Sequence, residues 1–307
     1  MTVLMTLGPL LGALILGFYW HVKSLSVGVI DASLKWLTFS MLGLIGYSIG
    51  ALENLASKLL EAGYIALVLF VLVVILNVVC LALSGRYLSD DNKVSTSGAG
   101  QQKLKVSWST FSDSIQTVLW VVGGGFLGYF SQGYFEHVDT LVTWMLYLLL
   151  FLVGQQLHLA NYRLRSLFLN VQGLIIAITT LLSTFLAAVV GAWYLEMPVL
   201  HALAVVSGFG WYSLSGILLS DLGFPLLGTT SFLLDIGREI IALMLIPVLA
   251  KINKHCSVGI SGATAMDFTL PMLGKFHGSM IIPTAIASGF VLSMLVPVFI
   301  PLFMSFN

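Results

Sequence analysis

Long runs of apolar residues, separated by short polar stretches, cover almost the whole chain. A helix needs about 20 consecutive apolar residues to cross a bilayer. Eight runs have about this length, and we expect membrane helices over residues 2–20, 34–52, 62–84, 115–134, 139–158, 171–194, 232–250 and 280–304. Two further apolar segments, 199–220 and 258–275, are dense in glycine, serine and threonine and are expected to be interrupted. The pattern predicts an all-α polytopic membrane protein with about eight transmembrane helices and two broken or re-entrant segments.

Composition places the chain among membrane proteins. Of the 307 residues, 58% are hydrophobic and only 8% are charged, whereas soluble proteins carry about 25% charged residues. The mean hydropathy is +1.02. We therefore expect a single domain over residues 1–307, embedded in a lipid bilayer, in which the longest polar stretch, 85–113, is a loop. The net charge is zero and basic residues form no stripe, so nucleic acid is not an expected partner.

The sequence lacks the common motifs for enzymes, cofactors and metals. It has no GxGxxG opening a βαβ unit, no Walker-type loop, no HExxH and no GxSxG. Cys80 and Cys256 form neither a disulfide framework nor a metal motif, and we interpret them as packing residues. We expect no enzyme activity, no cofactor and no metal site.

Lysine and arginine residues gather in alternate loops. The loops after the first, third and fifth predicted helices carry most of them. By the positive-inside rule these loops are cytoplasmic, so the N-terminus faces outside. If segments 199–220 and 258–275 enter the membrane and return, Lys251, Lys254 and Lys275 also face the cytoplasm and the C-terminus lies outside. Ten full or broken crossings are the competing topology.

A short internal similarity is compatible with an inverted repeat. LIGYSIGAL at 44–52 resembles LVGQQLHLA at 152–160, with glycines in matching positions. An offset of three spans relates halves of about 1–84 and 115–194 by an inversion, which is common among secondary transporters. Residues 199–307 follow these halves and carry the candidate site.

Three charged residues interrupt the apolar run 232–250, namely Asp235, Arg238 and Glu239. A charged side chain at the bilayer centre costs about 2.5–3.5 kcal/mol on insertion scales, so such residues usually mark a transport pathway. Asp235 and Arg238 are three positions apart on a helix, and we interpret them as neutralising each other near the outer interface. Glu239 lies deeper and has no basic residue one turn later, so we expect it to be functional.

Asp267 is a second acid in an apolar setting, within SGATAMDFTLP. Pro271 clashes with the carbonyl four residues earlier, which is that of Asp267, so an unwound or kinked backbone is expected. Non-helical backbone at membrane depth is tolerated only where it is buried in protein or lines a watery cavity. The alternative is a solvated acid in a turn at the membrane interface.

The segment SGFGWYSLSG at 207–216 supplies secondary candidates. Its glycines allow close backbone approach, and an aromatic face can hold an ammonium group by cation–π attraction. Tryptophan and tyrosine also serve as plain interfacial anchors, and both interpretations stay open. The secondary substrate-site candidates are Trp211, Tyr212, Ser213, Ser215, Thr264, Asp235 and Arg238.

Other polar residues near helix ends receive simpler interpretations. His201 and Asp221 flank the first interrupted segment and are expected to be solvated loop residues. Gln155, Gln156 and His158 close the fifth predicted helix and could face a cavity.

Three strings carry a resemblance to a known family: SGFGWYSLSGILLSDLG at 207–223, DIGREIIALMLIPVLAK at 235–251 and GATAMDFTLPML at 262–273. They resemble the LysO family of bacterial lysine exporters, with which the first half agrees more loosely. The resemblance implies a multi-pass exporter of L-lysine in the bacterial inner (cytoplasmic) membrane, with eight spans and both termini outside. It also implies two essential intramembrane acids, which fall on Glu239 and Asp267.

The residues and the resemblance together favour secondary active export of L-lysine and close cationic analogues by lysine/proton antiport. Glu239 and Asp267 are expected to pair with the ammonium groups, and a proton replaces the departing lysine on a carboxylate. The alternative is a sodium-coupled symporter of an amino acid or organic anion, in which acids and backbone carbonyls bind Na⁺. An intramembrane enzyme is disfavoured because Ser213 and His201 have no triad-like surroundings.

Overall fold

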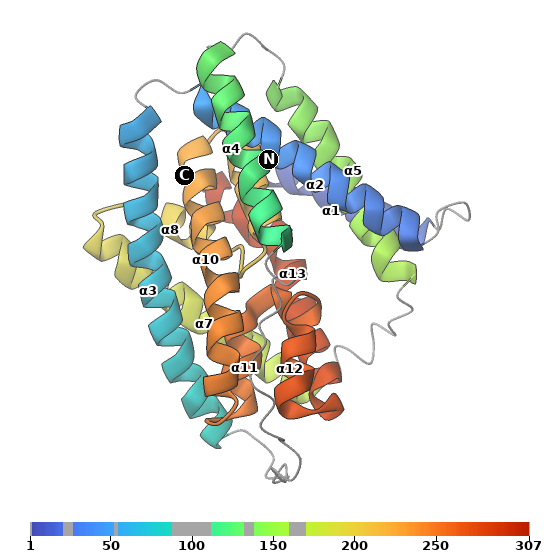
Figure 1. Ribbon diagram of the computed structural model, residues 1–307, viewed down its shortest axis with the longest axis vertical. Coiled ribbons are helices and arrows are strands. Elements are labelled where there is room, and N and C mark those ends of the chain that lie inside the picture. The colour runs from blue at the N-terminus through green and yellow to red at the C-terminus, as the bar shows by residue number, and fades with distance from the viewer. Residues whose placement is uncertain are drawn as a thin grey trace.

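The computed structural model describes residues 2–20, 27–51, 55–87, 112–131, 138–159 and 170–306. Within these ranges the chain is helical and contains no strand (Figure 1). The helices are α1 (Thr2–Tyr19), α2 (Val27–Gly50), α3 (Leu55–Tyr87), α4 (Ser112–Ser131), α5 (Val138–Leu159), α7 (Val171–Tyr194), α8 (Val199–Val206), α9 (Tyr212–Asp221), α10 (Pro225–Leu249), α11 (Lys254–Ser261), α12 (Leu270–His277) and α13 (Ile282–Ser305). Two 3₁₀ turns, η2 (Gly262–Met266) and η3 (Ser279–Ile281), flank α12. Most of the predicted loop 85–113 lies outside the described residues.

All eight segments predicted to be membrane helices are helical over their described residues. By length and composition, four described helices could cross a bilayer: Gly28–Ser48 of α2, Ala56–Tyr87 of α3, and all of α7 and α13. The outer face of α3 is apolar, as expected for contact with lipid. Its exposed residues at every fourth position are Leu67, Val71, Ile75, Val79 and Leu83. These features describe a helical, multi-pass membrane protein.

Helices α8 and α9 form a hairpin that turns back inside the protein. α9 packs along α10 with Gly216 against Phe232 and Gly228 against Ser220. The end of α9 therefore lies beside the start of α10, and the two helices are antiparallel. α8 begins beside the end of α7, on which it packs. The predicted interrupted segment 199–220 is thus a helical hairpin, and the chain enters and leaves it at the same end of the bundle.

Helices α11 and α12 form a second hairpin, and they lie side by side at the opposite end of the molecule (Figure 1). His277 Nε2 of α12 lies 2.9 Å from Ser257 Oγ of α11, which joins the open ends of the hairpin. The segment 258–275 is therefore also an interrupted segment that folds back as a hairpin. Both segments fold back as hairpins, which the re-entrant topology requires, and the way they cross the membrane stays a prediction.

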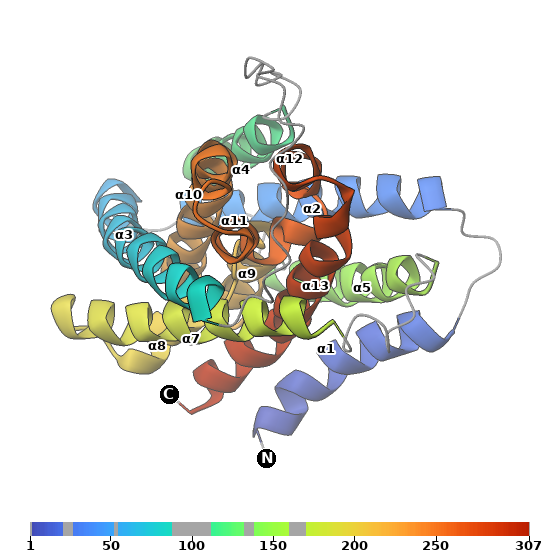
Figure 2. The same ribbon diagram turned by 90° about the horizontal axis from the view of Figure 1, so that it is seen from below.

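Helices α1, α2, α4 and α5 form a group beside these hairpins, and Figure 2 shows α3 and α7 on the opposite flank. α1 packs on α5, and α2 packs on both α4 and α5. Glycines make the closest contact: a Cβ on Gly46, Gly124 or Gly128 would overlap a backbone carbonyl of the facing helix. Small residues let membrane helices approach in this way. The group meets the first hairpin where α2 and α5 pack on α9, and it also contacts α13 through α1.

Candidate functional site

The two hairpins meet where their helices are interrupted. Residues 207–211 between α8 and α9 (the first break) leave the helical path, and Phe209 has a φ of 50°. Residues 262–269 between α11 and α12 (the second break) begin at Gly262, whose φ is 62°. The N–H of Ala263 donates to the carbonyl of Phe209 at 2.9 Å. We call this point of contact between the two breaks the crossing.

Four short helices end near the crossing, so backbone groups without helical partners gather there. A helix leaves unpaired carbonyls at its C-terminal end and unpaired N–H groups at its N-terminal end, with matching partial charges. The carbonyl ends belong to α8 and α11. Ser231 Oγ donates to the carbonyl of Val205 at 2.7 Å. Arg238 Nε and Nη2 donate to the carbonyls of Ile260 and Gly259, each at 3.4 Å.

The N–H ends belong to α9 and α12, and each has a carboxylate beside it. Asp235 Oδ1 accepts from the backbone N–H of Gly210 at 2.8 Å, and its Oδ2 accepts from Ser215 Oγ at 2.7 Å. Asp267 Oδ1 accepts from the N–H of Phe268 at 2.5 Å, just before α12 begins. Negative charge is favoured at this end of a helix. Each of the four helix ends at the crossing therefore has a polar side chain beside it.

One face of α10 supplies three of these side chains. Ser231, Asp235 and Arg238 are spaced by four and three residues, which places them on one side of the helix, and all three are fully buried. Asp235 and Arg238 were predicted to neutralise each other near an interface. Their opposite charges attract each other, but no direct ion pair joins them among the described residues, and Asp235 bonds to the first break and Arg238 to the second. Both side chains form hydrogen bonds with residues distant in sequence, and a rule based on spacing along one helix cannot predict such partners.

Glu239 and Asp267 differ in their surroundings. Glu239 follows Arg238 on α10 and is buried, with 3% of its surface exposed. Asp267 is exposed beside the start of α12, and α12 packs on α10. The backbone at Asp267 is non-helical, with φ −137° and ψ −85°, as predicted from Pro271. That both acids act on one substrate stays a prediction.

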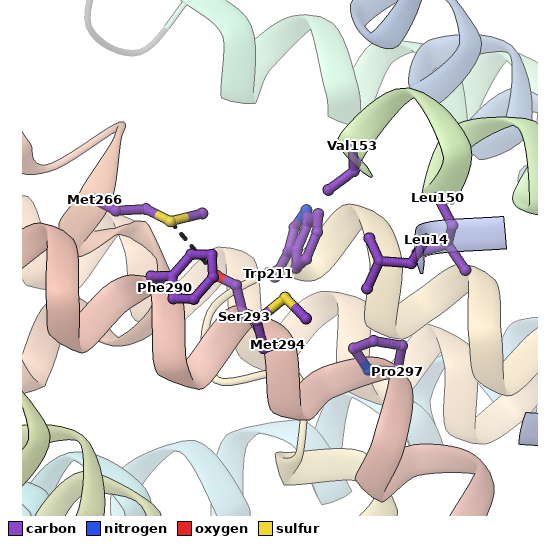
Figure 3. Close-up of a pocket in the computed structure, with 9 residues that line it drawn as sticks. All are labelled: Leu14, Leu150, Val153, Trp211, Met266, Phe290, Ser293, Met294 and Pro297. Carbon is purple, nitrogen blue, oxygen red and sulfur yellow. Dashed lines mark hydrogen bonds between the residues drawn. The ribbon is translucent and has the colours of Figure 1, made fainter. Parts of the chain in front are cut away.

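A pocket adjoins both breaks (Figure 3). Trp211 reaches it from the first break and Met266 from η2, while the other walls come from α1, α5 and α13. Those walls consist of Leu14, Leu150, Val153, Phe290, Ser293, Met294 and Pro297. The lining is apolar except for the Ser293 hydroxyl, so it suits an aliphatic chain, and the Trp211 ring can hold an ammonium group by its face. The wall from α13 was not predicted, because its residues look like any apolar membrane helix.

The other secondary candidates have structural contacts. Tyr212, Ser213 and Ser215 lie in the first turn of α9. The Tyr212 ring packs edge-on against Phe232, with 5.9 Å between the ring centroids. Thr264 Oγ1 donates to a carbonyl of the preceding turn at 2.8 Å, which stabilises η2. The structure therefore brings these residues to the crossing, where Ser215 and Thr264 stabilise the breaks.

Other polar residues, which were predicted to lie in solvated loops or to face a cavity, have different surroundings in the structure. Asp221 is the half-buried last residue of α9 and accepts from a hydroxyl of α5, and His201 is half-buried within α8. Neither is the solvated loop residue predicted. Gln155 is buried and donates to two carbonyls at the end of α1, so it joins α5 to α1. His158 is exposed at the end of α5, and the side chain of Gln156 lies outside the description.

A buried polar cluster adjoins Arg238 and was not predicted. In the orientation of the Asn77 amide that satisfies both of its ends, its NH₂ group donates to the hydroxyls of Ser183 and Thr184 of α7, the second at 3.2 Å. Its oxygen then accepts from Arg238 Nη2 at 3.2 Å. The signal in the sequence is a single amide inside the apolar run VLVVILNVVC.

Comparison with known proteins places the chain in a family. The family model described as "Lysine exporter LysO" matches residues 118–304. The chain is 37% identical over 275 residues to "Lysine exporter LysO" of Escherichia coli strain K12, and the match covers 90% of each chain. It is 37% identical over 186 residues to "Putative lysine exporter" of Haemophilus influenzae, covering 61% of this chain and 95% of that one. No solved structure matches. From the family model and the coverage of these relatives, the chain belongs to the LysO family of lysine exporters.

Proposed function

We propose that this protein exports L-lysine in exchange for protons, with Glu239 and Asp267 as the carboxylates that take up substrate and proton. The observation that carries the proposal is the crossing of two interrupted hairpins, arranged by α10 through Ser231, Asp235 and Arg238. Discontinuous helices whose ends meet are the usual binding sites of secondary transporters. Glu239 is placed directly after this set on the same helix, and Asp267 lies in the second break.

The mechanism follows from the charges of lysine, which carries two ammonium groups and one carboxylate at neutral pH. Glu239 and Asp267 pair with the ammonium groups, and the apolar pocket beside Trp211 receives the aliphatic stem. When lysine leaves, a proton replaces it on a carboxylate. Moving one positive charge out against an inside-negative potential costs about 2.3 kcal/mol per 100 mV. One-for-one exchange with a proton removes that cost, because no net charge moves.

We propose eight membrane spans, formed by α1, α2, α3, α4, α5, α7, α10 and α13, with the two hairpins entering from opposite sides. The end of α3 meets the start of α11 through Ser84 Oγ and His255 Nδ1, which are 2.9 Å apart. Basic residues cluster at this end: Arg86, Lys251, Lys254 and Lys275. By the positive-inside rule this end faces the cytoplasm and both termini lie outside, with the protein in the bacterial inner membrane.

We also propose that the whole chain is built from inverted repeats. Exchanging α1–α2–α3 with α4–α5–α7, and α8–α9–α10 with α11–α12–α13, converts several of the observed helix contacts into one another. The α1–α5 contact becomes the α4–α2 contact, α3–α10 becomes α7–α13, and α7–α8 becomes α3–α11. This correspondence supports the repeat inferred from residues 44–52 and 152–160, and extends it to the hairpins.

Transport of radiolabelled lysine into inverted membrane vesicles tests the proposal. Inversion turns the cytoplasmic face outward, so an acidic lumen should drive lysine uptake, independently of sodium. Glu239→Gln and Asp267→Asn should each abolish uptake while the protein remains inserted and monodisperse. Glu61→Gln, at an exposed position of α3, is the matched control and should transport normally. Near-normal uptake by both site variants would refute the assignment of the acids.

The same vesicles separate proton exchange from sodium coupling. Carbonyls near the second break could serve as Na⁺ ligands, but those of Gly259 and Ile260 already accept from the Arg238 guanidinium. A positive charge at this place opposes cation binding. Uptake that follows the sodium gradient at constant pH would replace antiport by sodium coupling.

A further inference from the structure

Arg238 has hydrogen-bonding capacity that the fold does not use. Its side chain is fully buried, yet Nη1 has no hydrogen-bond partner among the described residues. Nε and Nη2 donate to carbonyls at 3.4 Å, which is long for such bonds. A guanidinium carries five N–H donors and is costly to bury without acceptors. An arginine that served only to donate to the carbonyls at the end of α11 would not need a further N–H group without an acceptor. We call the Nη1 side of the guanidinium its free edge.

The nearby acid Asp235 attracts Arg238 by its charge, but among the described residues it accepts no hydrogen bond from Nη1. Both oxygens of Asp235 accept other hydrogen bonds, one from Gly210 and one from Ser215. Arg238 also touches the part of the chain that is interrupted: a Cβ on Gly262 would lie 3.1 Å from Nη2. The guanidinium is therefore covered by the second break, whose backbone is not held by a continuous helix.

The charge balance at the crossing indicates what the free edge would bind. Three acids lie near the buried base Arg238: Asp235 and Glu239 belong to α10 with Arg238, and Asp267 belongs to the second break, which covers the guanidinium. These acids suit the two ammonium groups of lysine but repel its carboxylate. A guanidinium binds carboxylates through two parallel N–H···O bonds, the strongest class of such contacts.

We propose that Arg238 binds the α-carboxylate of the transported amino acid through its Nη1 edge when the second break moves aside. This inference rests on the proposed lysine export. It makes Arg238 the residue that distinguishes a cationic α-amino acid from a diamine of the same length without a carboxylate.

Competition in proteoliposomes tests this role with two unlabelled ligands, L-lysine and 1,5-diaminopentane. Wild-type transport of labelled lysine is measured first, and its absence would overturn the proposed function and not only the role of Arg238. In Arg238→Gln and Arg238→Lys, the concentration of lysine needed for half-inhibition should rise about tenfold or more. The concentration of 1,5-diaminopentane should change less than about threefold, because the diamine makes no contact with Nη1.

A binding assay and a control variant show whether a loss of transport comes from lost binding of the carboxylate or from a damaged fold. Where a variant no longer transports, ligand-induced thermal stabilisation of the detergent-purified protein replaces the competition, and the charge-retaining Arg238→Lys serves if Arg238→Gln does not fold. Ser231→Ala is the matched control, since it loses a bond to the α8 end on the same helix face and should affect both ligands equally. Equal loss of lysine and diamine binding in the Arg238 variants would overturn the proposal and leave Arg238 a purely structural residue. Unchanged lysine binding would overturn it as well.

Discussion

Replacing Gly262 by alanine tests whether the crossing of the two breaks holds the protein together. Gly262 has φ 62° and ψ −132°, a conformation that side chains disfavour. A Cβ at this position would overlap the carbonyl oxygen of Phe209 in the first break and lie 3.1 Å from Arg238 Nη2. The overlapping atom belongs to the backbone, so it cannot be relieved by turning a side chain. The two breaks must separate, and the hydrogen bond from Ala263 to Phe209 lengthens from 2.9 Å.

The magnitude has two parts, and a second glycine isolates one of them. Backbone strain at such a position costs about 1–3 kcal/mol. Gly278 has φ 77° and ψ 178°, but a Cβ there would meet nothing within 4 Å, so Gly278→Ala measures strain alone. Gly262→Ala adds overpacking, about 1–3 kcal/mol, and a weakened hydrogen bond, about 1 kcal/mol. The difference between the variants should be about 2–4 kcal/mol.

Thermal unfolding of both variants in the same detergent gives this difference. At about 2–4 °C per kcal/mol for a domain of 150–250 residues, Gly262→Ala should unfold at least about 5 °C below Gly278→Ala. Lysine uptake into vesicles should be lost in Gly262→Ala and largely kept in Gly278→Ala. Equal melting temperatures and equal uptake would show that the crossing contact is not important, and the site built on it would fail with it.

Three other substitutions probe the supporting contacts. Asp235→Asn can still accept from the first break, so lysine uptake in vesicles should fall only partly, whereas a loss as complete as that of Glu239→Gln would assign Asp235 a direct part in transport. Ser231→Ala leaves the α8 carbonyl end without its donor and should destabilise the protein by about 1 kcal/mol in thermal unfolding; an unchanged melting temperature would contradict that bond. Gly124→Leu should destabilise by more than about 1 kcal/mol because it separates α2 from α4, while Gly123→Leu, which faces open space, should not, and similar melting temperatures would argue against the glycine contact.

The apolar pattern located the long helices because length and hydrophobicity act locally. The boundary of α10 was less accurate: it begins at Pro225, seven residues before the predicted start at 232. Thr229 and Thr230 explain the difference, since their hydroxyls donate to the carbonyls of Pro225 and Leu226 at 2.8 Å. A threonine that bonds to its own helix is no longer polar toward its surroundings. Hydropathy counts such residues as polar, so the prediction began the apolar run too late.

The broken segments were also visible in the sequence, because glycine, serine and proline interrupt a helix by local chemistry. Lysine placement then favoured re-entrant hairpins over full crossings. The contacts of Gly216 with Phe232 and of His277 with Ser257 are those of hairpins, and the membrane topology stays a prediction. The pocket beside Trp211 could not be predicted from the sequence. Its walls come from α1, α5, α13 and both breaks, and nothing in one segment indicates which others it will meet.

The roles of the charges on α10 show where spacing ceases to be informative. Asp235 and Arg238, three residues apart, satisfy the rule for a helical ion pair, yet each bonds to the backbone of a different hairpin. The rule compares one side chain with another, whereas a membrane interior with interrupted helices also contains unpaired N–H and carbonyl groups that compete for every charge. Ser231 belongs to the same set, because an uncharged donor suffices for one carbonyl end. Where polar residues recur along one face of a membrane helix and broken segments lie nearby in the sequence, helix ends should therefore be considered as their partners before other side chains. By this criterion Arg238 is the member of the set with capacity left for a ligand, because its bonds to the α11 carbonyls leave Nη1 without a hydrogen-bond partner in the part of the chain that the structure describes.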